Sequence, residues 1–275
     1  MGIFDGCLLA CDIDGTLIEN GYVNPKNVEM IEYFMREGGT FSLSTGRSIG
    51  AISDVLSKLK RVSASVVSNG CMIYDYANSK IIHDEVIPNK DYRIAKMVID
   101  SPLNIGIEVH CGENVFTLAR NRNTTMHQVY EKFEAPDVSF DDIKDKKWNK
   151  VLYCCLSVED RNKLKELLKD EKTDCSFIDT CATLNGEFHN YYEQIPFGVS
   201  KATALEKLCK ILNIKSGCLY AIGDYYNDIE MLKCADICAV TNTSPDEVKK
   251  YADYLTVSCS DGAVADFIEY LIRKD

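Results

Sequence analysis

The sequence predicts an α/β protein with a doubly wound parallel sheet, a Rossmann-like core, interrupted by an inserted α+β domain. Three observations predict this fold class. Short apolar runs alternate with amphipathic stretches at both ends of the chain, as strands and helices do in a parallel sheet. The middle of the chain instead contains paired strand patterns around a turn. The length of 275 residues suits one large domain with an insertion.

The N-terminal segment gives the first alternation of strands and helices. Apolar or β-branched runs at 6–12, 40–44 and 65–67 predict strands, and the amphipathic stretch at 27–36 predicts a helix. Asn24-Pro25 supplies the start of that helix and Gly38-Gly39 its end. We therefore expect a strand–helix–strand unit at the start of a parallel sheet.

The C-terminal segment repeats the pattern after Ser200. Helices are expected at 201–212, at 228–234 and after Asp261-Gly262, and strands at 218–222 and 237–240. These two segments, residues 1–83 and 189–275, are predicted to form one core domain.

Residues 84–188 are predicted to form the inserted α+β domain. Strands are expected at 106–109 and 114–119 around a turn at 110–113, with another strand near 188–195, and helices at 90–101, 123–133 and 159–168. The turn at 110–113 and a polar loop at 181–187 are candidate substrate contacts of this domain.

Composition excludes several classes of protein. The net charge of -11 disfavours nucleic acid as a partner. The 13 cysteines have no C-x-x-C spacing, which indicates buried thiols in a reducing compartment. No apolar run reaches membrane-spanning length and no signal peptide precedes Asp12, so we expect a cytoplasmic protein without a membrane partner, either monomer or dimer.

The run Asp12-Ile-Asp14-Gly-Thr16 follows a predicted buried strand. Side chains two residues apart in an extended segment face the same way, so both carboxylates can enter one site. Two like charges at this separation require a cation. The run therefore predicts a site for a metal ion, although an Asx turn at the end of a strand is the simpler alternative.

Four stretches in order resemble the motifs of the haloacid dehalogenase superfamily. They are Cys11–Leu17 with its D-x-D-G-T run, Ser44-Thr-Gly-Arg47, Gly198-Val-Ser-Lys201, and Gly223-Asp-Tyr-Tyr-Asn-Asp228. Further stretches are similar to the Cof-type branch of small-molecule phosphatases: Ser68-Asn-Gly70, Glu193 with Pro196, and Asp261-Gly262. The resemblance implies a phosphatase of a small phosphorylated metabolite, such as a sugar phosphate, with the inserted domain as a cap over the site.

Three positions depart from the motifs that the resemblance leads us to expect. Tyr225 replaces a small polar residue, Ala202 replaces a glycine, and Val240-Thr-Asn-Thr243 replaces Met-Gly-Asn-Ala. None of these changes removes a functional group that phosphoryl transfer requires.

Phosphate chemistry assigns roles to the metal-binding and reacting groups. Mg²⁺ takes oxygen ligands, which we expect from Asp12, the backbone carbonyl of Asp14, and Asp224. Asp12 is the predicted nucleophile that forms an aspartyl-phosphate, and Asp14 the predicted acid and base. Asn227 and Asp228 would orient metal-bound waters, or cap the helix that they begin.

The remaining site residues are expected to bind phosphate. Thr45, the Gly46 amide and Lys201 would hold the phosphoryl oxygens and balance their charge, with Asn227 as a further contact. Arg47 would touch the substrate or pair with an acid. A phosphomutase-type phosphotransferase and a receiver-type signalling module use similar groups and remain alternatives.

Overall fold

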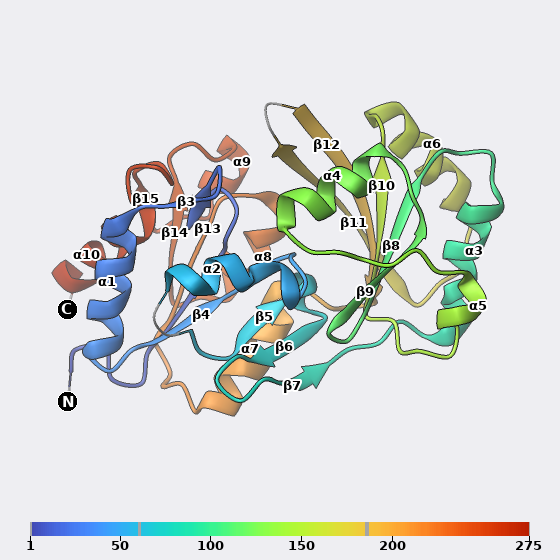
Figure 1. Cartoon of the computed structure of the whole chain (residues 1–275). Coiled ribbons are helices and arrows are strands. Elements are labelled where there is room, and N and C mark those ends of the chain that lie inside the picture. The colour runs from blue at the N-terminus through green and yellow to red at the C-terminus, as the bar shows by residue number, and fades with distance from the viewer. Residues whose placement is uncertain (1, 60–61, 185–186, 275) are drawn as a thin grey trace. The chain divides into compact units, whose positions relative to one another are not determined.

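The computed structural model describes residues 2–59, 62–184 and 187–274 of the chain (Figure 1). They form two compact units. The first comprises Met1–Gly46, Ser53–His83 and Ser200–Asp275, and the second comprises Arg47–Ile52 and Asp84–Val199. Each unit has its own sheet and its own apolar core.

The sheet of the first unit has five parallel strands in the order β15-β14-β13-β1-β4. Its members are β1 (Leu8–Cys11), β4 (Thr40–Leu43), β13 (Leu219–Gly223), β14 (Ile237–Thr241) and β15 (Tyr254–Thr256). At the end of β1, Cys11 lies opposite Ile222 on one side and Leu43 on the other. The chain therefore winds outward from β1 in both directions, and the predicted fold class is confirmed.

Helices cover both faces of this sheet. Helices α7 (Lys201–Leu212) and α8 (Ile229–Cys234) pack on the core that contains Leu8 and Ala10 of β1. Helices α1 (Pro25–Arg36) and α10 (Ala263–Lys274) contact each other, and Figure 1 shows them side by side. The Phe34 ring of α1 meets the Tyr220 ring, whose neighbour Ala221 faces the α7 core, so α1 lies on the opposite face.

Local sequence explains where the helices of the first unit begin. The Asn24 side chain accepts a hydrogen bond from the backbone N–H of Lys26, and Pro25 occupies the first turn of α1, as predicted. Ser200 caps α7 in the same way through the N–H of Thr203.

Shorter elements complete the first unit. They are β2 (Ile18–Glu19), β3 (Tyr22–Val23), α2 (Ser53–Lys58), β5 (Ser65–Val67), η2 (Ser68–Gly70), β6 (Met72–Asp75), β7 (Lys80–Asp84), η4 (Tyr226–Asp228) and α9 (Asp246–Lys249). Strand β5 continues the main sheet through an isolated parallel bridge between Ser44 and Val66.

The second unit contains an antiparallel five-stranded sheet in the order β11-β12-β10-β8-β9. Its strands are β8 (Gly106–Cys111), β9 (Asn114–Ala119), β10 (Lys150–Cys155), β11 (Cys175–Leu184) and β12 (Glu187–Pro196). Its helices are η1 (Gly50–Ile52), η3 (Asn89–Tyr92), α3 (Arg93–Asp100), α4 (Arg122–Glu131), α5 (Phe140–Ile143) and α6 (Val158–Leu168).

The two faces of this sheet differ in chemistry. One face packs an apolar core around Trp148, whose ring stacks on Tyr92 at a centroid distance of 4.0 Å. The other face carries buried charges: Glu108 accepts from His127 Nδ1 at 2.7 Å, and Lys150 pairs with Glu193 at 3.2 Å. Pairing and hydrogen bonds offset the desolvation of these groups.

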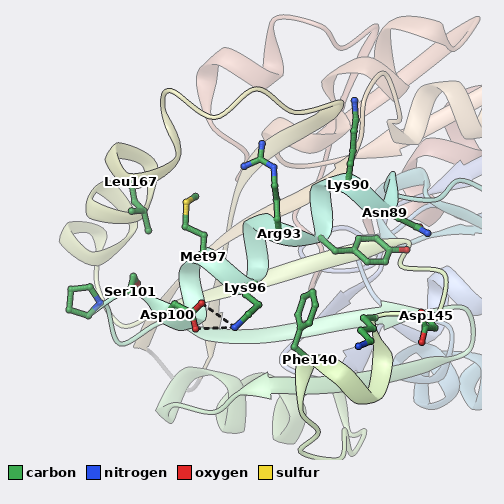
Figure 2. Close-up of a pocket in the computed structure, with 13 residues that line it drawn as sticks. Asn89, Lys90, Arg93, Lys96, Met97, Asp100, Ser101, Phe140, Asp145 and Leu167 are labelled. Carbon is green, nitrogen blue, oxygen red and sulfur yellow. Dashed lines mark hydrogen bonds and ion pairs between the residues drawn. The ribbon is translucent and has the colours of Figure 1, made fainter.

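A pocket of about 960 Å³ lies in the second unit, beside α3, and is lined by aromatic and charged side chains that include Tyr92 and Phe140 (Figure 2). Its cations already have partners: Lys96 pairs with Asp100, and Arg93 with Glu171. None of the predicted site residues lines this pocket.

Two expectations about the second unit are wrong. The predicted turn at 110–113 begins too early, because His110 and Cys111 continue β8 and pair with Val115 and Asn114. The predicted loop at 181–187 is mostly strand: β11 extends to Leu184, β12 begins at Glu187, and residues 185 and 186 lie outside the described residues. The register of β11 with β12 continues from Cys175 opposite Pro196 to Leu184 opposite Glu187, so the hairpin extends through most of the predicted loop.

The boundary predicted between residues 188 and 189 falls within β12. Strand β12 pairs with β10 and β11, so the second unit extends to Val199.

None of the 13 cysteines forms a disulfide, and all of them lie within the described residues. Within the described part of the chain, no helix combines the length and apolar character needed to cross a membrane.

Candidate active site

Three of the predicted site residues follow neighbouring parallel strands. Asp12 comes directly after β1, Thr45 shortly after β4, and Asp224 directly after β13. The carboxyl ends of parallel strands lie at one edge of the sheet, which is where open α/β sheets bind ligands. The backbone N–H of Asp12 donates to Ile222 O at 3.0 Å, which continues the β1–β13 ladder and fixes the first of these residues.

Lys201 joins two of the acids. Its Nζ donates to Asp12 Oδ1 at 2.6 Å and to Asp228 Oδ1 at 2.7 Å. The Lys201 side chain is 1% exposed, and the carboxylates that hold it are buried as well. Because Lys201 is the first residue of α7, the Ser200 cap also fixes the point from which this side chain extends.

Both carboxylate oxygens of Asp228 accept hydrogen bonds from the protein. While Oδ1 accepts from Lys201, Oδ2 accepts from the backbone N–H groups of Asp224 at 3.0 Å and Tyr225 at 3.1 Å. Gly223 makes room for this carboxylate, since a Cβ there would lie 2.6 Å from Asp228 Cγ. Asp228 thus orients both Lys201 and the loop that carries Asp224.

Asp224 lies against the first motif. Its Oδ1 accepts from Thr16 Oγ1 at 3.2 Å, and a Cβ at position 15 would lie 2.3 Å from its Oδ2. Gly15 also has φ +84°, a backbone conformation that side chains disfavour. Position 15 therefore requires glycine for two independent reasons.

The three acids are crowded together in a buried place, which disfavours their charged forms. Carboxylate oxygens of Asp12, Asp224 and Asp228 lie within 4.8 Å of one another, and Asp14 is not a member of this group. Burial raises the pKa of Asp12, which the Lys201 charge lowers only in part. Burial, followed by the charges of Asp12 and Asp228, raises the pKa of Asp224 well above its ordinary value.

A hard cation fits this arrangement. Burial alone would lower the pKa of Lys201, but Asp12 and Asp228 together raise it, so the lysine remains charged. The Lys201 ammonium group is therefore the one cation bound to this cluster of three carboxyl groups among the described residues. Since the hydrogen bonds of Asp228 occupy both its oxygens, Asp12 and Asp224 are the acids best placed to ligate an ion through oxygen.

Thr45 and Gly46 form a tight loop beyond β4. Thr45 is 1% exposed, its N–H donates to Val66 O at 3.0 Å, and its carbonyl accepts from the N–H of Asn69 at 3.0 Å. A Cβ on Gly46 would come within 3.1 Å of Asn69 Nδ2.

Arg47 begins a short segment that groups with the second unit. Its Nη1 donates to Ala51 O at 3.3 Å, and its guanidinium lies over the Tyr130 ring, 5.5 Å from the centroid. Its positive charge also contributes to the lowered pKa of Glu131, although burial and His127 have larger effects on that group.

Asn227 reaches a residue that received no role from the sequence. Its Nδ2 donates to Asn69 Oδ1 at 3.2 Å. Asn69 and Thr16 both belong to motif stretches. Their partners, Asn227 and Asp224, lie far away in the sequence, so motif spacing could not predict these contacts.

The chain matches known proteins over nearly its whole length. A family model described as haloacid dehalogenase-like hydrolase matches residues 9–268. The chain is 25% identical over 272 residues to the 5-amino-6-(5-phospho-D-ribitylamino)uracil phosphatase YcsE of Bacillus subtilis, covering 96% of this chain and 95% of that protein. It is 23% identical to the HMP-PP phosphatase of Cronobacter sakazakii, covering 95% and 94%.

Solved structures agree on the fold. The sugar phosphatase BT4131, of haloacid dehalogenase subclass IIB, superposes with a TM-score of 0.80 at 18% identity, covering 96% of this chain and 98% of that chain. The parallel sheet, the acidic edge and the match of the family model agree: this chain belongs to the haloacid dehalogenase-like hydrolases.

Proposed function

We propose that the protein is a Mg²⁺-dependent phosphatase that hydrolyses small phosphorylated metabolites through an aspartyl-phosphate on Asp12. The observation that carries this proposal is the buried bridge of Lys201 between Asp12 and Asp228, beside Asp224. It supports the proposal because a carboxylate that could attack phosphorus lies beside a fixed cation and two further acids. The phosphatase activities named for YcsE and for the HMP-PP phosphatase support the reaction class.

Bound Mg²⁺ would reduce the repulsion between an anionic nucleophile and the phosphate dianion. Asp12 and Asp224, with the backbone carbonyl of Asp14, would hold it. Asp228 is better described as a residue that orients Lys201 and the Asp224 loop, because both its oxygens accept hydrogen bonds from the protein.

The chain's own groups perform the reaction in two steps. Asp12 attacks phosphorus and forms an acyl phosphate, while Asp14 donates a proton to the departing alkoxide. Asp14 then takes a proton from the water that hydrolyses the acyl phosphate. Lys201 stays charged next to Asp12, and the Thr45 hydroxyl with the Gly46 N–H would bind the phosphoryl oxygens during both steps.

The second unit is proposed to act as the cap that selects the leaving group. We infer that the leaving group is that of a hydroxyl-rich molecule, as in a sugar phosphate. The sugar phosphatase activity named for BT4131 supports this substrate class.

A screen of phosphorylated metabolites with Mg²⁺ tests the reaction and names the substrate. In H₂¹⁸O, hydrolysis places label in released phosphate. Transfer of the phosphoryl group to a second metabolite would instead indicate a phosphomutase-type reaction. An acyl phosphate that persists for hours without turnover would indicate a receiver-type signalling module.

A further inference from the structure

The loop Ser68–Gly70 has an unusual backbone. Three consecutive residues have positive φ angles: 51° at Ser68, 54° at Asn69 and 99° at Gly70. Residues other than glycine adopt this region rarely, and such strain persists only where surrounding contacts enforce it. The N–H of Asn69 donates to Thr45 O at 3.0 Å, and that of Cys71 to Ser68 O at 3.2 Å.

The Asn69 side chain lies between two motif loops. It is 2% exposed, its Oδ1 accepts from Asn227 Nδ2 at 3.2 Å, and its amide packs against Gly46. The buried side-chain amide of Asn69 therefore contacts both Gly46, in the loop after β4, and Asn227, in the segment after Asp224.

The same loop touches the third motif. A Cβ on Gly70 would lie 2.1 Å from the carbonyl oxygen of Ser200, so the two backbones are in direct contact. Ser200 is the cap of α7 and precedes Lys201. The loop Ser68–Gly70 therefore contacts the loops that carry Gly46, Lys201 and Asn227.

We propose that Asn69 is a positioning residue for phosphoryl transfer: it holds the Asn227 amide and shapes the Thr45–Gly46 loop. This inference rests on the proposed function, because it assigns Asn69 to the same site. Asn69 acts through Asn227 and Gly46, and the strained backbone of Ser68 and Asn69 is the cost of placing its amide there.

The substitution Asn69→Gly isolates the side chain, because glycine accepts the left-handed backbone without strain. We expect kcat to fall about 10- to 100-fold, as when hydrogen-bonded partners behind a site are removed, with KM nearly unchanged. The matched control is Asn213→Gly. Asn213 has φ 55°, is exposed and caps the C-terminal end of α7, so the same change there should leave kcat at the wild-type value.

A double-mutant cycle tests whether Asn69 acts through its partner. Asn69→Gly combined with Asn227→Ala should lower kcat by less than the product of the two separate losses, because the two residues share one hydrogen bond. Fully multiplicative losses would overturn the inference, as would wild-type kcat in Asn69→Gly or an equal loss in Asn213→Gly.

Crystal structures of the wild-type protein and Asn69→Gly provide a readout that does not depend on turnover. We expect one position of the Asn227 amide in the wild type and a displaced or multiple one in the variant. An unchanged Asn227 amide overturns the inference. Failure of the wild type to hydrolyse p-nitrophenyl phosphate with Mg²⁺ would instead refute the proposed function, so the two failures are distinguishable.

Discussion

Replacing Asp228 by asparagine tests how the site is held together. The change keeps the shape of the side chain but places an NH₂ group near Lys201 Nζ or near the N–H groups of Asp224 and Tyr225, all of which are donors. One charge-assisted hydrogen bond is lost, which costs about 1.5–3 kcal/mol. Relief of repulsion between Asp228 and the other acids offsets roughly 1 kcal/mol of this. We expect the free energy of unfolding to fall by about 0.5–2 kcal/mol.

Asp228→Asn should also lower activity. Lys201 would lose the charge of one of its two carboxylates, and either Lys201 or the Asp224 loop would lose its acceptor, so kcat/KM should fall about 10- to 100-fold. Urea denaturation and steady-state kinetics measure the two effects. Asp253→Asn is the matched control, since Asp253 Oδ2 also accepts from a strand N–H, that of Cys238, at 2.9 Å. Wild-type kcat/KM in Asp228→Asn, or an equal loss in Asp253→Asn, would refute the reasoning.

Three further predictions concern other parts of the molecule. Gly15→Ala should lower kcat/KM at least about tenfold by pushing Asp224 away, whereas Gly21→Ala, with φ +75° but open space around it, should retain full activity in the same assay. Asp224→Asn should abolish the rise in Tm that Mg²⁺ gives the wild type, and a preserved Mg²⁺ effect would exclude Asp224 as a ligand. Burial alone would lower the pKa of His127, but Glu108 and Glu131 raise it from 6.5 to about 10. The ion pairs of protonated His127 should therefore stabilise the fold fully below pH 6.5, and this stabilisation should disappear as the pH rises through about 10. Urea denaturation from pH 6 to 10 should show this loss in the wild type and no such slope in His127→Gln.

The elements of the first unit were readable from local patterns. Helix α7 has the predicted bounds, because its apolar periodicity and its Ser200 cap agree, and β5 also matches. Strand β10 received no prediction: all its residues are buried, and the short apolar run after Lys150 has no periodicity that separates strand from helix. The end of β11 was predicted as part of a polar loop at 181–187, whereas it pairs with β12.

The candidate site was predictable in its residue types but not in its connections. The order of the motifs predicted that Asp12, Lys201 and Asp224 lie in one site, and the structure places them together at one edge of the sheet. For Asp228 the sequence suggested a water-orienting or capping residue, whereas the structure shows it bound to Lys201 as well as to the loop. Asn69 depends on left-handed backbone angles and on partners in separate motifs, neither of which spacing reveals.

Trapping of the intermediate tests the central claim that Asp12 is the nucleophile. The variant Asp14→Asn should accumulate the acyl phosphate from p-nitrophenyl phosphate, whose leaving group needs no proton, because the base that activates water is missing. Borohydride reduction converts an aspartyl-phosphate to homoserine, which peptide mass spectrometry can locate. We predict homoserine at position 12, dependent on substrate and Mg²⁺ and absent from Asp12→Asn. Turnover by Asp12→Asn, or homoserine at another aspartate, would contradict the account.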